Sequence, residues 1–144
     1  MHILVTGATG FVGAALCRTL LARGHAVRAV TRRERAVGPS RLQWVVVPDI
    51  AEALDRHTLF DGIEVVVHLA AIAHRAATEA RIRRVNVDAT RRLAEAAAGS
   101  VRRFVFLSSA KVHGENSGAG AYDEASALRP DDPYGRSKLE GELA

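Results

Sequence analysis

The chain has 144 residues, a formal net charge of +4 and a hydrophobic content of 48%. This length predicts one domain with enough chain to bury a core, and the apolar runs are too short to span a bilayer, so no membrane partner is expected. No signal peptide is visible, and the one cysteine, Cys17, excludes an internal disulfide. We therefore expect a cytoplasmic protein.

Arginine supplies nearly all of the positive charge. The arginines form scattered pairs, with no interleaved aromatic residues and no long basic run, and this pattern is typical of a solvated surface. We therefore expect no nucleic-acid partner. No metal site is expected either.

The first thirteen residues contain a short apolar run, Ile3–Val5, followed by a glycine-rich turn. The run is long enough for a strand buried on both faces. Gly7 would allow the tight turn, Gly10 would let the backbone approach a pyrophosphate, and Gly13 would let the next helix pack on the strand. Free N–H groups at the start of that helix favour an anion. We assign a dinucleotide to this loop, with contacts from Gly7, Thr9, Gly10, Phe11, Val12 and Gly13.

Strand-like and helix-like segments alternate along the rest of the chain. This alternation predicts a parallel sheet with right-handed crossovers. The expected fold class is α/β, a Rossmann-type doubly wound parallel sheet. In chain order, we expect a helix ending at Gly24, strands at 26–31 and 42–47, a weaker helix at 51–60, a strand at 64–70, a long helix at 78–98, a strand at 103–107, a loop at 108–132 and a final helix from Pro133.

The residues just after each strand matter most, because ligands bind at the carboxyl ends of parallel strands. After the second strand, where a carboxylate normally binds the ribose hydroxyls, the chain has Thr31, Arg32 and Arg33. Guanidinium groups suit a 2′-phosphate, so NADP is favoured over NAD. The alternative is that both arginines are merely exposed loop charges.

The third and fourth strands are followed by weaker signals. Asp49 and Ile50 would hold the adenine, or Asp49 would be the N-cap of the next helix. His68 ends an apolar strand, a position that favours a buried core residue over a catalyst. The residues after it have small side chains where a flat cofactor must lie close to the backbone, and we assign cofactor contacts to Leu69, Ala70 and Ala71.

Asn86 interrupts the apolar face of the long predicted helix. A buried amide must find hydrogen-bond partners. Asn86 is therefore either a structural clip or part of the cofactor site, and the sequence leaves both open.

The clearest chemical signal is in the last predicted helix, where Asp132 would be the N-cap and Pro133 the first helical residue. Tyr134 and Lys138 then lie one turn apart on one face. A phenol titrates near pH ~10, and a neighbouring cation favours its ionised form. A hydroxyl of Ser108-Ser109, after the fifth strand, would complete a proton-handling set. Alone, such a Tyr/Lys pair is commonly a surface contact, but with the glycine loop and the serine it indicates catalysis.

The chain resembles the extended short-chain dehydrogenase/reductase family in five motifs that occur in the same order: Thr6-Gly-Ala-Thr-Gly-Phe-Val-Gly13, His68-Leu-Ala-Ala71, Asn86-Val-Asp-Ala-Thr90, Ser108-Ser-Ala-Lys-Val-His-Gly114 and Tyr134-x-x-x-Lys138. Within that family it is most similar to the NAD(P)-dependent epimerase/dehydratase group, which acts on nucleotide sugars. The resemblance implies hydride exchange with a nicotinamide at a sugar hydroxyl carbon. It also implies that Tyr134 is the general acid or base, that Lys138 binds the ribose and favours the phenolate, and that Ser109 hydrogen-bonds the reacting oxygen.

Three positions depart from the pattern of this family. Thr31 replaces the acid that would bind the ribose in an NAD enzyme. The sugar 4,6-dehydratases usually have Thr-Asp-Glu where this chain has Ser109-Ala110-Lys111, which argues against a dehydratase. His113 stands where many members have a tyrosine, so the substrate contacts are expected to differ.

Family members continue well beyond the Tyr/Lys helix. We therefore expect residues 1–144 to be an NAD(P)-binding domain, truncated before the last strands and the C-terminal substrate-binding domain. The parent protein would be a nucleotide-sugar epimerase or oxidoreductase, and this chain alone an inactive fragment. Two alternatives remain, an NADP-dependent ketone or 4-keto-sugar reductase of the same family and a non-catalytic dinucleotide-binding module. A homodimer also remains open.

Overall fold

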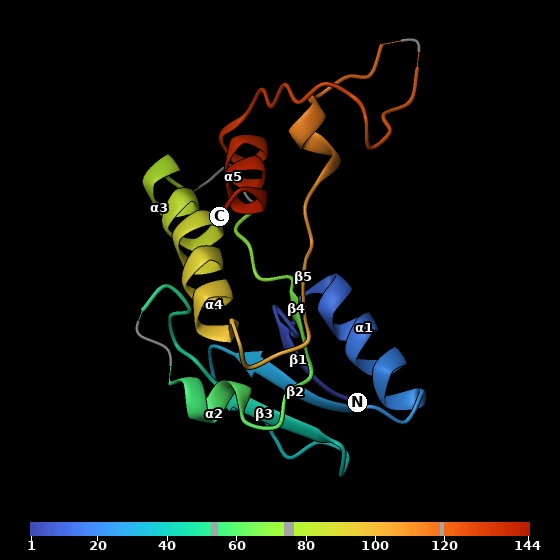
Figure 1. Ribbon diagram of the computed structural model, residues 1–144, viewed down its shortest axis with the longest axis vertical. Helices are drawn as coiled ribbons and strands as arrows, with labels where there is room; N and C mark the ends of the chain where they lie inside the picture. The colour runs from blue at the N-terminus through green and yellow to red at the C-terminus, as the bar shows by residue number, and fades with distance from the viewer. Residues whose placement is uncertain (53–54, 74–76, 119) are drawn as a thin grey trace. The chain divides into compact units, whose positions relative to one another are not determined.

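The computed structural model describes residues 1–52, 55–73, 77–118 and 120–144. Within these ranges the chain forms one sheet whose neighbouring strands are all parallel (Figure 1). The strand order is β3-β2-β1-β4-β5, which reverses direction at β1 as in doubly wound dinucleotide-binding folds. The predicted fold class is confirmed. The strands are β1 (His2–Thr6), β2 (Ala26–Thr31), β3 (Leu42–Val46), β4 (Val65–His68) and β5 (Arg103–Phe106).

The chain divides into two compact units. Unit 1 comprises residues 1–70 and 92–107 and contains the five strands, and unit 2 comprises residues 71–91 and 108–144. Across the described ranges, every helix is too short or too polar to traverse a lipid bilayer. The α-helices are α1 (Phe11–Ala22), α2 (Arg56–Phe60), α3 (Glu79–Arg83), α4 (Ala89–Ala97) and α5 (Pro133–Glu142).

Each face of the sheet in unit 1 carries a hydrophobic core. On one face, Cys17 of α1 lies in a core with Ile3 and Val5. On the other face, α2 and the end of α4 form a second core, in which Leu93 lies with Leu4. Successive residues of β1 therefore enter opposite cores, and this explains why its apolar residues run consecutively instead of alternating.

The helix predicted at 51–60 begins later than expected. Asp55 is its N-cap, because the Asp55 side chain accepts a hydrogen bond from the His57 backbone N–H at 3.0 Å. Asp49 instead accepts from the Ala51 N–H at 2.9 Å, in a turn that precedes the helix. The interpretation of Asp49 as the helix N-cap is therefore wrong. Positions 53 and 54 of the predicted helix lie outside the described residues.

The long helix predicted at 78–98 is present, but its middle is wound more loosely. Thr78 caps α3 by accepting from the Arg81 N–H at 3.3 Å. Residues Arg84–Asp88 then form a π-helical turn, η1, which leads directly into α4. A π turn inserts one residue into an α-helix and is often found at functional sites. Asn86 lies in this turn.

In unit 2, the predicted loop at 108–132 contains a turn of 3-10 helix, η2 (Ala110–His113). The Ser109 hydroxyl caps this turn by accepting from the Lys111 N–H at 3.3 Å. The loop then returns onto η2, because the Arg129 N–H donates to the Val112 carbonyl at 2.9 Å. The predicted final helix is α5, with Asp132 as its N-cap.

Candidate functional site

In the glycine loop of unit 1, separate stretches of backbone lie so close together that a side chain would not fit between them. Gly7 has φ of +66°, and a Cβ there would lie 2.8 Å from the Ala70 nitrogen. A Cβ on Gly13 would lie 2.1 Å from the Gly7 carbonyl oxygen, whereas one on Gly10 would lie 3.3 Å from that atom. Gly7 and Gly13 are thus required by packing, and Gly10 is exposed on the outside of the turn.

The N-terminus of α1 fits an anionic ligand. Gly10 is its N-cap, and in the described part of the chain no side chain caps the helix and no acidic residue lies in its first turn. The first N–H groups of α1 therefore have no side-chain cap, and such a helix start suits a pyrophosphate. The exposed Phe11 and Val12 begin this helix. Dinucleotide binding by this loop stays a prediction.

Thr6 connects the ends of β1 and β4 beside this loop. Its hydroxyl oxygen accepts from the N–H groups of Leu69 and Ala70, both at 3.2 Å, and lies 2.6 Å from Nδ1 of His68. His68 is fully buried beside Phe104 and Phe106. The structure thus gives His68 a role in the core, as its position in the sequence favoured.

The residues after β2 and β3 remain candidates for the adenosine half. Thr31 is buried, and its hydroxyl donates to the Arg33 carbonyl at 2.9 Å. Arg32 and Arg33 are exposed next to it. Ile50 is partly buried against the core, next to Asp49. Ala71, the last of the predicted contacts after β4, begins unit 2 and is exposed.

Unit 2 carries all three residues of the predicted proton-handling set. Tyr134 lies in the first turn of α5, Lys138 lies one turn further along, and Ser109 caps η2. Lys138 is only 2% exposed, and this burial lowers the pKa of its ammonium group to about 8, against a smaller opposing effect of Glu142 one turn later. Strongly perturbed pKa values of buried groups are found more often at functional sites than elsewhere.

Asn86 holds α5 in place. Its Oδ1 accepts from the Ile72 N–H at 2.7 Å, and its Nδ2 donates to the Ile72 carbonyl at 3.0 Å and to the Ser137 hydroxyl at 2.9 Å. Ser137 in turn donates to the Tyr134 carbonyl at 2.7 Å. The structure therefore shows the structural clip, one of the two alternatives for this buried amide, and the clip ends on the helix that bears Tyr134.

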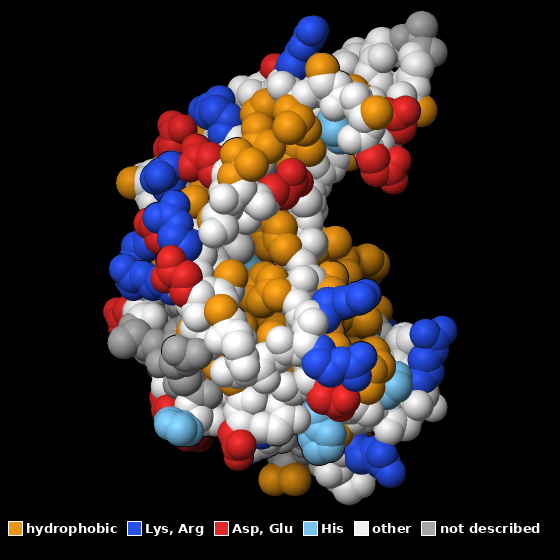
Figure 2. Space-filling model, in the orientation of Figure 1, with side chains coloured by type: hydrophobic (Ala, Val, Ile, Leu, Met, Phe, Trp, Pro, Cys, Tyr) orange, Lys and Arg blue, Asp and Glu red, His pale blue; other side chains and the backbone are white. Residues whose placement is uncertain are grey.

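Two ion pairs accompany this clip at the surface. Arg83 pairs with Glu140, and Arg136 Nη2 lies 3.1 Å from Glu79 Oε1. Figure 2 shows basic and acidic side chains interspersed over α3, without one dominant basic patch on the face in view. Pairs as exposed as these contribute little energy. The buried Asn86–Ser137 bond is therefore the stronger constraint on α5.

The burial of Lys138 predicts an unusual dependence of stability on pH. Its pKa is about 8 in the folded chain and near its ordinary value of 10.5 in the unfolded chain. Between these values the unfolded chain binds more protons, so the free energy of unfolding should rise with pH from 8 to 10.5, by roughly 3 kcal/mol. Urea unfolding followed by far-UV circular dichroism measures this rise. Lys138→Met should abolish it, whereas an equal rise in that variant would assign the effect to another group.

Comparisons with known proteins identify the family. The sequence model of the NAD dependent epimerase/dehydratase family matches residues 3–144 of the chain. The chain belongs to this family.

Several proteins that resemble the chain are members with a stated activity. The chain is 38% identical to the UDP-glucose 4-epimerase of Vibrio cholerae over 97% of its own length and 44% of that protein. It is 37% identical to the dTDP-glucose 4,6-dehydratase of Streptomyces griseus over 99% of its length and 48% of that protein. The UDP-glucuronic acid 4-epimerase of Bacillus cereus, solved with NAD, superposes with a TM-score of 0.85 at 34% identity and covers 99% of the chain and 50% of that structure. The chain spans about half the length of the relatives it matches.

The epimerase/dehydratase motifs contain contacts that the sequence did not reveal. Lys111, in the fourth motif, forms ion pairs with Glu115 and Asp132. Ser137, between the two residues of the Tyr/Lys motif, receives the Asn86 bond. The Lys111–Asp132 and Asn86–Ser137 contacts join residues far apart in the chain, so the sequence revealed the spacing of the motifs but not these pairings.

Proposed function

We propose that this chain carries the dinucleotide-binding and proton-transfer parts of a nucleotide-sugar epimerase. The observation that supports this most strongly is the arrangement of α5, with Tyr134 in its first turn and the buried Lys138 one turn later. A non-catalytic module would have no use for a lysine buried one turn from a tyrosine. An oxidoreductase does, because a phenol needs a nearby cation to act as a base near neutral pH, and Lys138 is still largely protonated there, since its pKa is about 8.

The residues of this chain have separate roles in the proposed reaction. The N–H groups at the start of α1 would bind the pyrophosphate, and Lys138 would bind the ribose. When bound, the nicotinamide would supply hydride exchange at a sugar carbon. Tyr134 would take the hydroxyl proton of that carbon at its phenol oxygen and later return it, while Ser109 would hydrogen-bond the same sugar oxygen.

The neighbours of Ser109 favour epimerisation over dehydration. Ala110 has no ionisable group, and the Lys111 ammonium is engaged by two carboxylates, with Asp132 Oδ2 at 2.8 Å. These contacts raise the pKa of Lys111, first through Asp132 and then through Glu115, so it is a poor proton donor. An elimination of water needs an acid and a base in addition to Tyr134, and these two residues offer neither.

The residues after β2 support NADP as the preferred cofactor. The Thr31 hydroxyl donates a hydrogen bond to the Arg33 carbonyl. Position 31 therefore has no carboxylate that could accept a hydrogen bond from a ribose hydroxyl. Arg32 and Arg33 are exposed beside it and suit a 2′-phosphate. This feature also favours the second candidate, a ketone or 4-keto-sugar reductase, because a reductase consumes its cofactor and an epimerase regenerates it.

Turnover by the full-length gene product tests these proposals. With UDP- and dTDP-hexoses and catalytic NADP, an epimerase should convert one sugar epimer into the other without net change in absorbance at 340 nm. A reductase should instead oxidise NADPH stoichiometrically with a keto substrate. Tight cofactor binding without any turnover would favour the non-catalytic module.

The same assay decides the cofactor. NADP should bind more tightly than NAD, measured by Trp44 fluorescence or calorimetry, and Arg33→Glu should reverse that order by removing a cation and adding a repulsive charge. Arg23→Glu, at the far end of α1, has the same charge change and should leave the order intact. Tighter binding of NAD by the unmodified protein would contradict the interpretation of the arginines.

A further inference from the structure

The residues of the proposed proton-handling set come from two separate segments of unit 2. Ser109 begins η2, and Tyr134 lies in the first turn of α5. A loop rich in glycine, serine and aspartate connects them. Contacts between η2 and the start of α5 therefore bear directly on their relative position.

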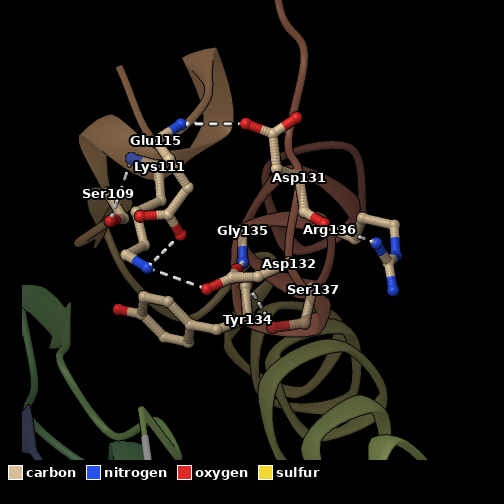
Figure 3. A network of polar contacts seen from close by, with 9 residues as sticks. All are labelled: Ser109, Lys111, Glu115, Asp131, Asp132, Tyr134, Gly135, Arg136 and Ser137. Carbon is tan, nitrogen blue, oxygen red and sulfur yellow. Dashed lines mark hydrogen bonds and ion pairs between the residues drawn. The ribbon is translucent and has the colours of Figure 1, made fainter. Parts of the chain in front are cut away.

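Asp132 joins these two segments through its two carboxylate oxygens (Figure 3). Oδ1 accepts from the Gly135 N–H at 2.5 Å and so caps α5. Oδ2 accepts from the Lys111 ammonium at 2.8 Å and so reaches η2. Tyr134 lies between Asp132 and Gly135 in the chain, within the turn that this cap fixes. Lys111 follows Ser109 by two residues, and its backbone N–H donates to the Ser109 hydroxyl.

A backbone contact lies at the base of this ion pair. A Cβ on Gly135 would lie 2.7 Å from the Lys111 carbonyl oxygen, so η2 and the first turn of α5 touch at this point. Lys111 thus contributes to the junction twice, with its carbonyl against Gly135 and with its ammonium group on Asp132. Its second partner, Glu115 at 2.5 Å, belongs to the loop and also reaches the start of α5, because its side chain contacts Asp132 and its backbone N–H donates to Asp131 Oδ2 at 3.0 Å.

We propose that Lys111 is a positioning residue, which acts through Asp132 to place the Ser109 hydroxyl correctly relative to the Tyr134 phenol. The proposal rests on the proposed function of these residues. Lys111 and Asp132 are partly exposed, at 36% and 26%, so their pairing adds little to stability. Position has a larger effect, because a displacement of about 1 Å at a reacting group can lower a rate by about 100-fold.

The proposal predicts a selective loss of kcat in the full-length gene product. Lys111→Met, and separately Asp132→Ser, should lower kcat by about 10- to 100-fold and leave KM for NADP and Tm nearly unchanged. Serine is as good an N-cap as aspartate but cannot reach Lys111. Because both changes break one contact, the double variant should be no slower than either single variant. Lys111→Arg should recover most of the rate, and Glu124→Gln, which neutralises an exposed carboxylate of the same loop, should match the unmodified protein.

Three results would overturn the proposal: full kcat in Lys111→Met, losses that multiply in the double variant, or a joint decline of Tm and cofactor binding. A second measurement does not depend on turnover. The Tyr134 signal in the ¹³Cζ-tyrosine NMR spectrum is assigned as the resonance that Tyr134→Phe removes. Lys111→Met and Asp132→Ser should shift the Tyr134 resonance alike, and Glu124→Gln should not. If these shifts occur in a protein that shows no turnover, the proposed function fails, but the positioning role of the Lys111–Asp132 contact stands. If the Tyr134 resonance does not move, that positioning role is refuted.

Discussion

Replacement of Tyr134 by phenylalanine should lower kcat of the proposed hydride exchange by at least about 100-fold, since general acid–base catalysis contributes typically ~10²–10⁴-fold. The substitution removes only the hydroxyl group, so the Kd of NADP should hardly change. Tyr134 is partly exposed in the first turn of α5, and the Asn86–Ser137 clip contacts its backbone carbonyl and not its ring. The fold should therefore survive. Initial rates with a sugar nucleotide give kcat, and calorimetry gives the Kd.

A matched control is available in the same unit. Tyr122, which stacks on His113 at 5.2 Å, is the other tyrosine of the chain, and Tyr122→Phe should retain its rate. Lys138→Met should differ from both variants by losing cofactor affinity as well as rate, because the lysine is proposed to bind the ribose. Full activity of Tyr134→Phe would remove the tyrosine from the mechanism.

The sequence predicted the sheet well because its signals are local. β2 was predicted at 26–31 and spans Ala26–Thr31. A strand buried between two cores must be apolar throughout, and a glycine or a polar turn ends it. The start of α5 was equally readable, since an aspartate followed by a proline is a strong signal for a helix N-terminus.

The errors arose where a local sequence pattern is compatible with more than one structure. Two aspartates lie near the start of the helix predicted at 51–60, Asp49 before it and Asp55 within it, and only the structure shows that Asp55 is the cap. The π turn at Arg84–Asp88 adds one residue to a helix without breaking its apolar face, so periodicity could not reveal it. The 3-10 turn at Ala110–His113 is too short to have a period at all.

The candidate site was predictable as a set of residues but not as a set of contacts. The spacing of Tyr134 and Lys138 places both on one helix. Nothing in the sequence pairs Lys111 with Asp132 or Asn86 with Ser137, because each pair joins segments distant in the chain. Such pairings depend on how η1, η2 and α5 pack in unit 2, and packing is decided by the tertiary structure.

Substitutions in the glycine loop should separate folding from cofactor binding. Gly13→Ala should lower the free energy of unfolding by about 3 kcal/mol, since overpacking costs ~1–3 kcal/mol or more. Its Cβ would lie 2.1 Å from the Gly7 carbonyl oxygen and 2.8 Å from the Ala8 Cα, both backbone atoms that cannot move aside easily. Alanine normally stabilises a helix by ~1 kcal/mol relative to glycine, so the steric term must exceed that gain. Urea unfolding followed by Trp44 fluorescence measures the loss.

Gly10→Val, three residues earlier, should have the opposite profile. A Cβ at this position lies 3.3 Å from the Gly7 oxygen, and the residue is exposed with an extended backbone, so the fold should keep its stability. The branched side chain would nevertheless cover the first N–H groups of α1, where the pyrophosphate is proposed to bind, and dinucleotide binding should fall below detection in calorimetry. Unchanged affinity in Gly10→Val would place the nucleotide elsewhere. Normal stability in Gly13→Ala would mean that α1 does not pack against β1 as closely as the Gly7–Gly13 contact requires.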